Sequence, residues 1–458
     1  MLNQENFNGF WYPADQPEIR FHAVLNFGPD KSPRLTGIST FTAEQATFLR
    51  NAKEITIWGD LEGGENVTLF ECNCLSLLYP WAGTQSVELN AKTVVSGAFL
   101  KNSAEVAIEG MQVDFTVLGE WMDTYGHTTG YDENSDTHSL LYKAPEDIQF
   151  AINEQINAAF IFRMFREIKG AKVAFRQENL LSLKFLSPVS YDDALECEWR
   201  VQRFLTVAVW QQLNIISLSI RIKTSEATEY SDGYKWCRVF FRQSTYGLAE
   251  EGNETYFLRF PVVRPVIEPM LQSWFKLEEL TEPVISLLIA NIGKGDGFIQ
   301  NNFLNLVQAV EAFHRHIKQN TDQLKAEHTV KMDRILEQVR DASDKRWLSE
   351  KLAFAFEPSL RKRLKELFQE HCSVIFYNND VSNKSIVWVI ETITDKRNYY
   401  THYGKKISVT DADFMRLIVL TELLKLLLAV MIFRELGMDK EVLRERIPGR
   451  LKVKLPPK

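Results

Sequence analysis

Apolar residues alternate with polar ones along the first part of the chain, and this pattern predicts short strands. The strand-like segments are 18–27, 54–61, 66–78, 86–97 and 105–118. Clusters of Gly, Asn, Asp and Pro separate them, as is typical of turns between strands. We therefore predict a β-rich subdomain over residues 1–145, with an antiparallel sheet of the sandwich or barrel-like kind. The polar segment Gly126–Ser139 is interpreted as a loop.

A second group of strand-like segments follows, and one helix interrupts it. The strands are expected at 146–152, 171–177, 180–187, 215–223 and 236–243. The helix begins at Ser190, where a Ser–Asp pair is a capping signal, and it runs to Leu213. Residues 146–295 are therefore predicted to form an α+β subdomain that ends in a linker helix.

Apolar residues recur at helical spacing from Glu268 onward. Helices are expected at 268–292, 298–318, 322–339, on both sides of Pro358, at 384–403 and at 410–437. Pro358 must interrupt a helix, and Thr410 followed by Asp413 is a cap-like pair. A glycine-rich segment at 293–297 marks the main domain boundary. Residues 296–458 are predicted to be an all-α bundle of four or five helices, so the whole chain is α+β.

Charge is distributed unevenly between these regions. Residues 296–458 hold 28 Lys and Arg against 22 Asp and Glu, so their net charge is +6. Because the net charge of the whole chain is −7, residues 1–295 carry a net charge of −13. A cationic C-terminal part beside an anionic N-terminal part suggests that only the former meets a polyanion. Chance variation in surface charge is the alternative.

Five scattered cysteines are not the pattern of a disulfide framework. Cys72 and Cys74 could form half of a zinc site, but no second pair follows at finger-like spacing, which favours positions on a strand. The N-terminus lacks the pattern of a signal peptide, and the most apolar stretch, 423–433, is too short to span a bilayer. We expect a cytoplasmic protein without a membrane partner.

One charged residue interrupts the apolar stripe of the helix expected at 384–403. Ile386, Ile390 and Ile393 form the stripe, and Arg397 occupies its next position. Burial of a guanidinium group without a partner is costly, so we expect Arg397 to face a cleft or a partner subunit.

Asn398 and His402 are four residues apart and share one face of the same helix. The helix dipole near its C-terminus favours the protonated imidazole of His402. Together with Arg397, these residues suit cleavage of RNA without a metal, in which the ribose 2′-hydroxyl attacks the adjacent phosphorus. Histidine can act as base or acid, and arginine matches the phosphate geometry. DNA lacks the attacking hydroxyl and would not be cut.

Spacing alone does not establish this site. An arginine and a histidine five residues apart should occur by chance about 0.4 times in a chain of this composition. The basic helical context and the interrupted stripe are what support the hypothesis.

The segment RNYYTH, residues 397–402, resembles the R-N-x-x-x-H signature of the HEPN ribonuclease superfamily. The flanking segments FIQNNFLNLVQAVEAFHRHI and VIETITDKRNYYTHYG resemble the HEPN domain of the ApeA-like family. Two further segments, ITIWGDLEGGENVTLFEC and LECEWRVQRFL, resemble the N-terminal domain that accompanies it. The resemblance covers most of the chain.

The resemblance implies a bacterial anti-phage defence factor of the abortive-infection type. Such a protein would cut host RNA, often in tRNA anticodon loops, without a metal or other cofactor. Two bundles would pair into a homodimer or higher oligomer with a composite site, in which Arg397 and His402 match the invariant positions and Asn398 the polar one. The N-terminal region would sense a phage-derived trigger, residues 146–295 being the sensor subdomain.

Several residues around the motif are weaker candidates for RNA binding. Lys396, Lys405 and Lys406 could bind phosphates or simply be exposed lysines. Tyr399 and Tyr400 could stack on bases or pack at the seam between two subunits.

Two further interpretations complete the predictions. His314 and His316 are two residues apart and so face different sides of a helix, which favours core or solvated histidines over a metal site. The rival to a nuclease is a non-catalytic sensor or scaffold that binds a nucleotide or a partner protein, with the β-rich region as the recognition module.

Overall fold

The computed structural model of the chain describes residues 5–81, 84–170, 172–223, 233–243, 256–292, 297–317, 321–353, 355–376, 382–402, 410–449 and 452. The chain divides into two compact units. The first comprises 1–205, 212–254 and 259–272, and the second comprises 206–211, 255–258 and 273–458. The predicted domain limits after residues 145 and 295 stay predictions, and 293–296 lie outside the described residues.

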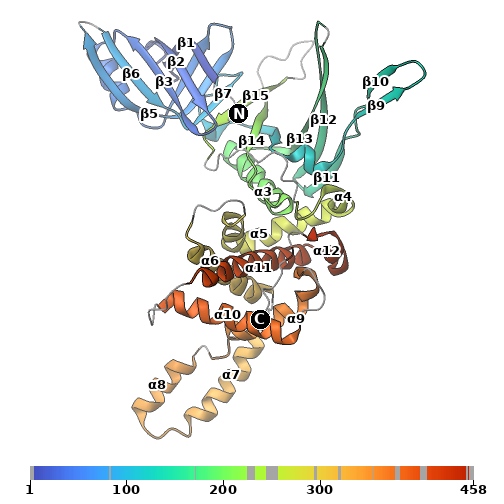
Figure 1. Cartoon of the computed structure of the whole chain (residues 1–458). Coiled ribbons are helices and arrows are strands. Elements are labelled where there is room, and N and C mark those ends of the chain that lie inside the picture. The colour runs from blue at the N-terminus through green and yellow to red at the C-terminus, as the bar shows by residue number, and fades with distance from the viewer. Residues whose placement is uncertain are drawn as a thin grey trace. The chain divides into compact units, whose positions relative to one another are not determined.

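A sheet of 13 strands forms the framework of the first unit (Figure 1). Its order is β11-β12-β13-β8-β14-β15-β7-β5-β4-β1-β2-β3-β6, and all neighbours are antiparallel. The strands are β1 (Glu5–Pro13), β2 (Phe21–Gly28), β3 (Lys31–Ser39), β4 (Ile55–Leu61), β5 (Asn66–Trp81), β6 (Thr84–Asn90), β7 (Thr93–Ser96), β8 (Ile108–Phe115), β11 (Ile148–Asn153), β12 (Ile156–Lys169), β13 (Lys172–Val189), β14 (Ile215–Lys223) and β15 (Tyr234–Phe241).

Six of these strands close into a barrel. β5, β4, β1, β2, β3 and β6 follow one another in the sheet, and β5 also pairs with β6. Short helices, α1 (Ala43–Arg50), α2 (Leu118–Met122) and α4 (Phe260–Val263), and the longer α3 (Tyr191–Val209) complete the unit's elements, although α3 ends in the second unit. The predicted barrel-like antiparallel sheet is confirmed, and so is the cap at Ser190, whose hydroxyl accepts the Asp193 N–H at 3.1 Å.

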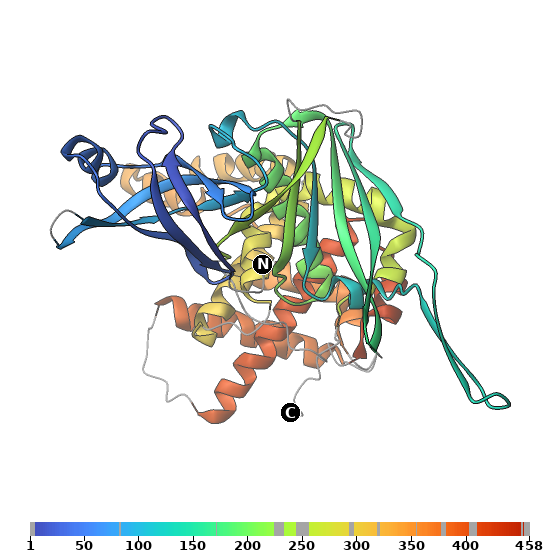
Figure 2. The same ribbon diagram turned by 90° about the horizontal axis from the view of Figure 1, so that it is seen from above.

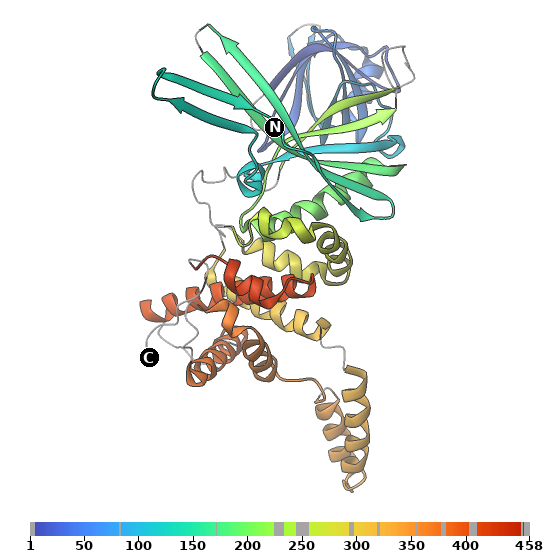
Figure 3. The same cartoon turned by 90° about the vertical axis from the view of Figure 1, so that its right-hand side faces the viewer.

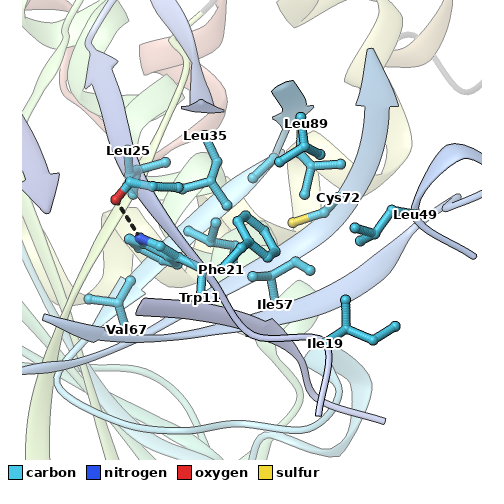
Figure 4. Packing of buried hydrophobic residues seen from close by; sticks show 14 of the residues in the cluster. Trp11, Ile19, Phe21, Leu25, Leu35, Leu49, Ile57, Val67, Cys72 and Leu89 are labelled. Carbon is cyan, nitrogen blue, oxygen red and sulfur yellow. Dashed lines mark hydrogen bonds between the residues drawn. The ribbon is translucent and has the colours of Figure 1, made fainter. Parts of the chain in front are cut away.

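The barrel encloses an apolar core that follows from the two-residue period of its strands (Figure 4). Trp11, Phe21, Leu25 and other inward side chains are almost fully buried. The Trp11 indole N–H donates to the Ala23 carbonyl at 2.9 Å, so this buried polar group is satisfied. A Cβ at Gly59 would collide with the Trp11 ring, which explains a glycine at that position of β4.

Cys72 and Cys74 belong to this core region. Cys72 is fully buried in the cluster, and Cys74 packs against it. Burial raises the pKa of both thiols. This opposes formation of the thiolate that zinc requires and supports the strand interpretation of the C-x-C pair.

The expectation of a loop over Gly126–Ser139 is wrong. β9 (His127–Asp132) and β10 (Thr137–Tyr142) form a separate two-stranded sheet, which projects from the other strands of its unit (Figure 2). Nearly every residue of the ribbon is exposed, so its sequence lacks the alternation by which half-buried strands are identified. β1, β3, β12 and α1 were likewise not predicted, and β13 is one strand where two were expected.

The second unit is helical, as predicted. α5 (Ile267–Ala290) leads into it and deviates from helical geometry at Thr281, two residues before Pro283. The helices that follow are α6 (Ile299–Ile317), α7 (Thr321–Leu336), α8 (Ala342–Leu352), α9 (Leu360–Ile375), α10 (Asn383–His402), α11 (Asp411–Glu435) and α12 (Lys440–Arg446). The Thr410 capping box of α11 is confirmed, whereas α12 was not predicted.

Four of these helices make the body of the bundle. α6, α9, α10 and α11 pack on one another, and α12 packs against α9. α7 and α8 pair with each other and extend away from this body (Figure 3). This packing places the C-terminal half of α10 against α6, with one face left toward solvent.

Candidate active site

The apolar stripe of α10 passes around Arg397. Ile386, Ile390 and Ile393 are buried, and the next buried side chain is Tyr400, seven residues after Ile393. The Tyr400 ring meets Phe303 of α6 edge-on, with 6.3 Å between ring centroids. The tyrosine makes the apolar contact, and Arg397 is only partly buried. That its guanidinium faces a cleft or a partner subunit stays a prediction.

Arg397, Asn398 and His402 all reach the surface at the end of α10. Asn398 and His402 are exposed, and the Arg397 guanidinium (Nη1) donates to the Asn398 side-chain carbonyl (Oδ1) at 3.2 Å. That bond directs the arginine toward the face shared by the other two residues. A phosphate could approach this face directly.

The C-terminal end of α10 is electrostatically unfavourable for an anion. Unsatisfied carbonyls at the C-terminus of α10 repel phosphate and favour a cation. The Arg397 carbonyl is already occupied, since it accepts the Thr401 hydroxyl at 2.7 Å. Arg397 itself and a protonated His402 are the charges that would offset this repulsion.

Lys396 is held in an ion pair. Its ammonium (Nζ) lies 3.2 Å from Oδ1 of Asp413 in the first turn of α11. A hydrogen bond from Thr410, and after it one from Lys396, holds the pKa of Asp413 below its ordinary value. The pair ties the motif helix to the start of α11, and a role in RNA binding would require Lys396 to leave it.

The remaining candidates near the motif stay predictions. The Tyr399 and Tyr400 rings meet edge-on, with 5.1 Å between centroids. Tyr399 is partly buried and Tyr400 is buried, so only Tyr399 offers part of its ring to a base. Lys405 and Lys406 lie outside the described residues.

His314 of α6 belongs to a buried polar network that the sequence pattern did not reveal. The Arg363 guanidinium on α9 contacts His314 Nδ1 at 3.2 Å, and Glu366 contacts His314 Nε2 at 3.0 Å. A guanidinium can only donate, so Nδ1 must be the acceptor, and Nε2 must carry the hydrogen that it donates to the Glu366 carboxylate. His314 is therefore a neutral core histidine with both nitrogens engaged.

Each nitrogen of the Arg363 guanidinium has a partner, although the residue is only 3% exposed. Its Nε donates to the Pro358 carbonyl at 3.0 Å, and its Nη2 lies 3.4 Å from Glu357, which also pairs with Arg315 at 2.9 Å. These contacts fix α9 against α6. Arg363 falls in a run of basic residues, so the sequence alone did not distinguish it from its exposed neighbours.

Two features are absent from the described residues. No group of three or more His, Cys, Asp or Glu side chains among them is placed to bind a metal ion. Within the same part of the chain, every helix is too short or too polar to cross a bilayer.

The chain matches two protein-family models. Residues 6–276 match ApeA N-terminal domain 1, and residues 304–442, which include the whole motif, match Apea-like HEPN. The first match alone spans more than half of the chain. The chain therefore belongs to the ApeA-like family, a defence-associated family in which this N-terminal domain precedes a HEPN domain.

This assignment confirms the resemblance drawn from the sequence. HEPN domains are generally ribonucleases, typically act on RNA and typically dimerise. No curated protein and no solved structure matches the chain.

Proposed function

We propose that this protein is a metal-independent endoribonuclease of bacterial anti-phage defence, with its active site at the end of α10. One observation carries the proposal. Asn398 and His402 are exposed on one face, next to an arginine bonded to Asn398, within the region that matches Apea-like HEPN.

The chemistry assigns a task to each of the three residues. The ribose 2′-hydroxyl attacks phosphorus, the bond from phosphorus to the 5′-oxygen breaks, and the products are a 2′,3′-cyclic phosphate and a 5′-hydroxyl. His402 takes the proton of the attacking hydroxyl or gives one to the leaving oxygen. Arg397 stabilises the charged phosphorane, and Asn398 orients the hydroxyl or the phosphate.

Pairing of two bundles would complete the site. The reaction needs a base and an acid, and each chain supplies a single histidine in the motif. A homodimer, or a higher oligomer, would bring two copies of Arg397 and His402 to one scissile phosphate. Exposure of these residues in one chain is what such a composite site requires.

Activity would be controlled by the N-terminal region. We propose that residues 6–276 keep the nuclease inactive in the cytoplasm until they recognise a phage-derived trigger. The HEPN part then cuts host RNA, with tRNA loops as the expected target, and growth of the infected cell stops. The anionic balance of residues 1–295 makes direct binding of RNA there unfavourable.

Cleavage of tRNA in the presence of EDTA tests the proposal. The unmodified protein, Arg397→Ala, Asn398→Ala and His402→Ala are purified from triggered cells, with Arg346→Ala as a control at an exposed arginine of α8. Loss of the base or acid should lower the cleavage rate about a hundredfold or more. The fold should persist, because Asn398 and His402 are exposed.

Three results would count against the nuclease. They are intact RNA with the unmodified protein, equal cleavage by the His402 variant, and products without a 2′,3′-cyclic phosphate. The first would favour the rival hypothesis of a non-catalytic sensor or scaffold. An active species that sediments as a monomer would contradict the composite site specifically.

A further inference from the structure

A groove of about 360 Å³ lies between α9 and α10. α9 contributes Arg361, Lys365 and Gln369 to its wall, and α10 contributes Val387, Ile390 and Glu391. This volume lies near the lower end of the range for small-ligand sites, which suits a unit of about the size of one nucleotide.

The groove and the motif occupy the same face of α10. Val387, Glu391, Asn398 and His402 are separated by four, seven and four residues, so they lie within about 60° of one another around the helix. Along the axis, Glu391 is about 10 Å from Asn398, and Val387 is about 16 Å from it. A strand that follows this face from the motif would enter the groove.

Two polar side chains of the groove have no partner among the described residues. Lys365 and Gln369 are exposed, and neither forms a hydrogen bond or ion pair with any of the described residues. Arg361 is 3.5 Å from Glu391, which offsets part of its charge. The charge of Lys365 is therefore not balanced within the described residues, and Gln369, one turn away, presents an amide that has no partner among them.

Apolar surface lies between these groups. Val387 is 52% exposed, and Ile390 lies beside it on the floor. An ammonium suits a phosphate, an amide suits the edge of a base, and the apolar floor suits the face of a base or a ribose. Such a combination fits single-stranded RNA, whose bases are free to leave the stack.

Arg363 makes this wall rigid. It lies two residues from both Arg361 and Lys365, about 200° around α9, so its buried contacts with His314 hold the helix from the opposite side. The groove residues are therefore presented from a fixed helix and not from a loop.

We propose that this groove is a subsite for RNA nucleotides that flank the scissile phosphate, and that it selects which RNA is cut. The inference rests on the proposed nuclease function and extends it. Lys365 would contact a backbone phosphate, Gln369 a base edge, and Val387 the face of the nucleotide.

Binding is measured first, in a protein that cannot cut. A fluorescent single-stranded RNA oligonucleotide is titrated with His402→Ala and with His402→Ala that also carries Lys365→Ala or Val387→Glu. Each added change should weaken binding about five- to tenfold, and loss of Lys365 should lower the salt slope by about one. Lys362→Ala, an exposed lysine of α9 outside the groove, should leave binding unchanged.

Cleavage then tests the role in selection. With His402 intact, Lys365→Ala should raise KM for the oligonucleotide and leave kcat nearly unchanged. A dinucleotide that spans only the scissile bond cannot reach the groove, so the variant should cut it as the unmodified protein does.

Two results would overturn the inference. One is binding of the oligonucleotide by Lys365→Ala and Val387→Glu as tight as by the Lys362 control. The other is that sedimentation shows the oligomer to dissociate when these residues are changed. The groove would then be an interface between copies of the chain. Failure of the unmodified protein to cut any RNA would count against the nuclease function, and the binding series would still decide whether the groove holds RNA.

Discussion

Glu198 in the first unit and Arg363 in the second are each 3% exposed, but their surroundings differ. Glu198 Oε1 accepts no hydrogen bond from the described residues, and burial raises the pKa of this carboxyl to about 8. Arg363 instead donates to His314, Pro358 and Glu357. Glu198 is tolerated in the interior because it is neutral, whereas Arg363 is tolerated because it is paired.

This difference shows how each unit should respond to change. A paired charge is sensitive to loss of its partners, because a buried group that loses its partner is left unsatisfied. A lone carboxyl is sensitive to pH, because ionisation in an apolar environment is opposed by lost hydration. Removal of a partner should therefore destabilise the helical unit at Arg363, and a rise of pH from about 5 to about 8 should destabilise the first unit at Glu198.

The largest effect is expected from Arg363→Ala. It removes the donor to His314 Nδ1 and leaves a cavity beside α6, so the helical unit should lose about 3–5 kcal/mol of stability. Chemical denaturation of the full chain, followed by tryptophan fluorescence, measures the loss. Lys362→Ala, one residue away but exposed, should change the free energy of unfolding by less than about 0.5 kcal/mol.

A double replacement separates pairing from packing. Arg363→Met and His314→Phe should each be destabilising, but together they should cost at least about 1 kcal/mol less than their sum, because neither member of the Arg363–His314 contact is then left without the other. Simple additivity of the two changes would show that the contact at 3.2 Å does not couple them.

Arg363 also shows why the site could be predicted only in part. In α9 an arginine within the apolar stripe is a buried structural residue, whereas in α10 Arg397 at a stripe position is partly exposed and bonded to Asn398. The sequence pattern is the same in both cases. The partners decide the outcome, and the partners of Arg363 come from other segments of the chain, His314 on α6 among them.

The fold was predictable where an apolar period stands out in the sequence. Four of the six barrel strands, β2, β4, β5 and β6, and the helices α6, α10 and α11 have such a period and were identified from it. β3 was not, because Pro33 and Gly37 interrupt it. A Cβ at Gly37 would lie 2.6 Å from the His22 carbonyl on the neighbouring strand, so the close approach of the two strands requires a glycine here. The same glycine weakens the sequence pattern by which β3 could have been predicted.

Glu198→Gln should have the next largest effect. It should raise the free energy of unfolding at neutral pH, whereas Arg363→Ala should lower it. The ordinary pKa of the carboxyl is 4.5, and it is about 8 in the folded protein. Below pH 4.5 the group is protonated in both states, and as pH rises toward 8 the unfolded state ionises first and is favoured. At pH 7 this lowers the stability of the first unit by roughly 3 kcal/mol, which the glutamine would relieve.

Thermal unfolding at several pH values tests this expectation. The midpoint of the unmodified protein should fall between pH 5 and pH 8, whereas that of Glu198→Gln should fall less, and the two should converge near pH 5. A constant difference across this range would show that the carboxyl does not stay protonated on folding.

The smallest effect is expected at the junction of α10 and α11. Thr410→Ala removes the side chain that accepts the Asp413 N–H at 3.2 Å, and it should cost about 1 kcal/mol. Thr410→Ser keeps the acceptor and should lower the free energy of unfolding by only a few tenths of that amount. Hydrogen exchange of the first-turn amides of α11 should quicken about fivefold in the alanine variant alone.

Acid should weaken the same junction in the unmodified protein. The pKa of Asp413 is held below its ordinary value of 3.8, so its contribution to stability is present above pH 3.8 and is lost as pH falls through the lowered pKa. Asp413→Asn, which also releases Lys396, should therefore differ from the unmodified protein at neutral pH and approach it in acid. If the difference in exchange rates at the start of α11 persisted unchanged to pH 3, the ionised carboxylate of Asp413 would not be what stabilises this turn.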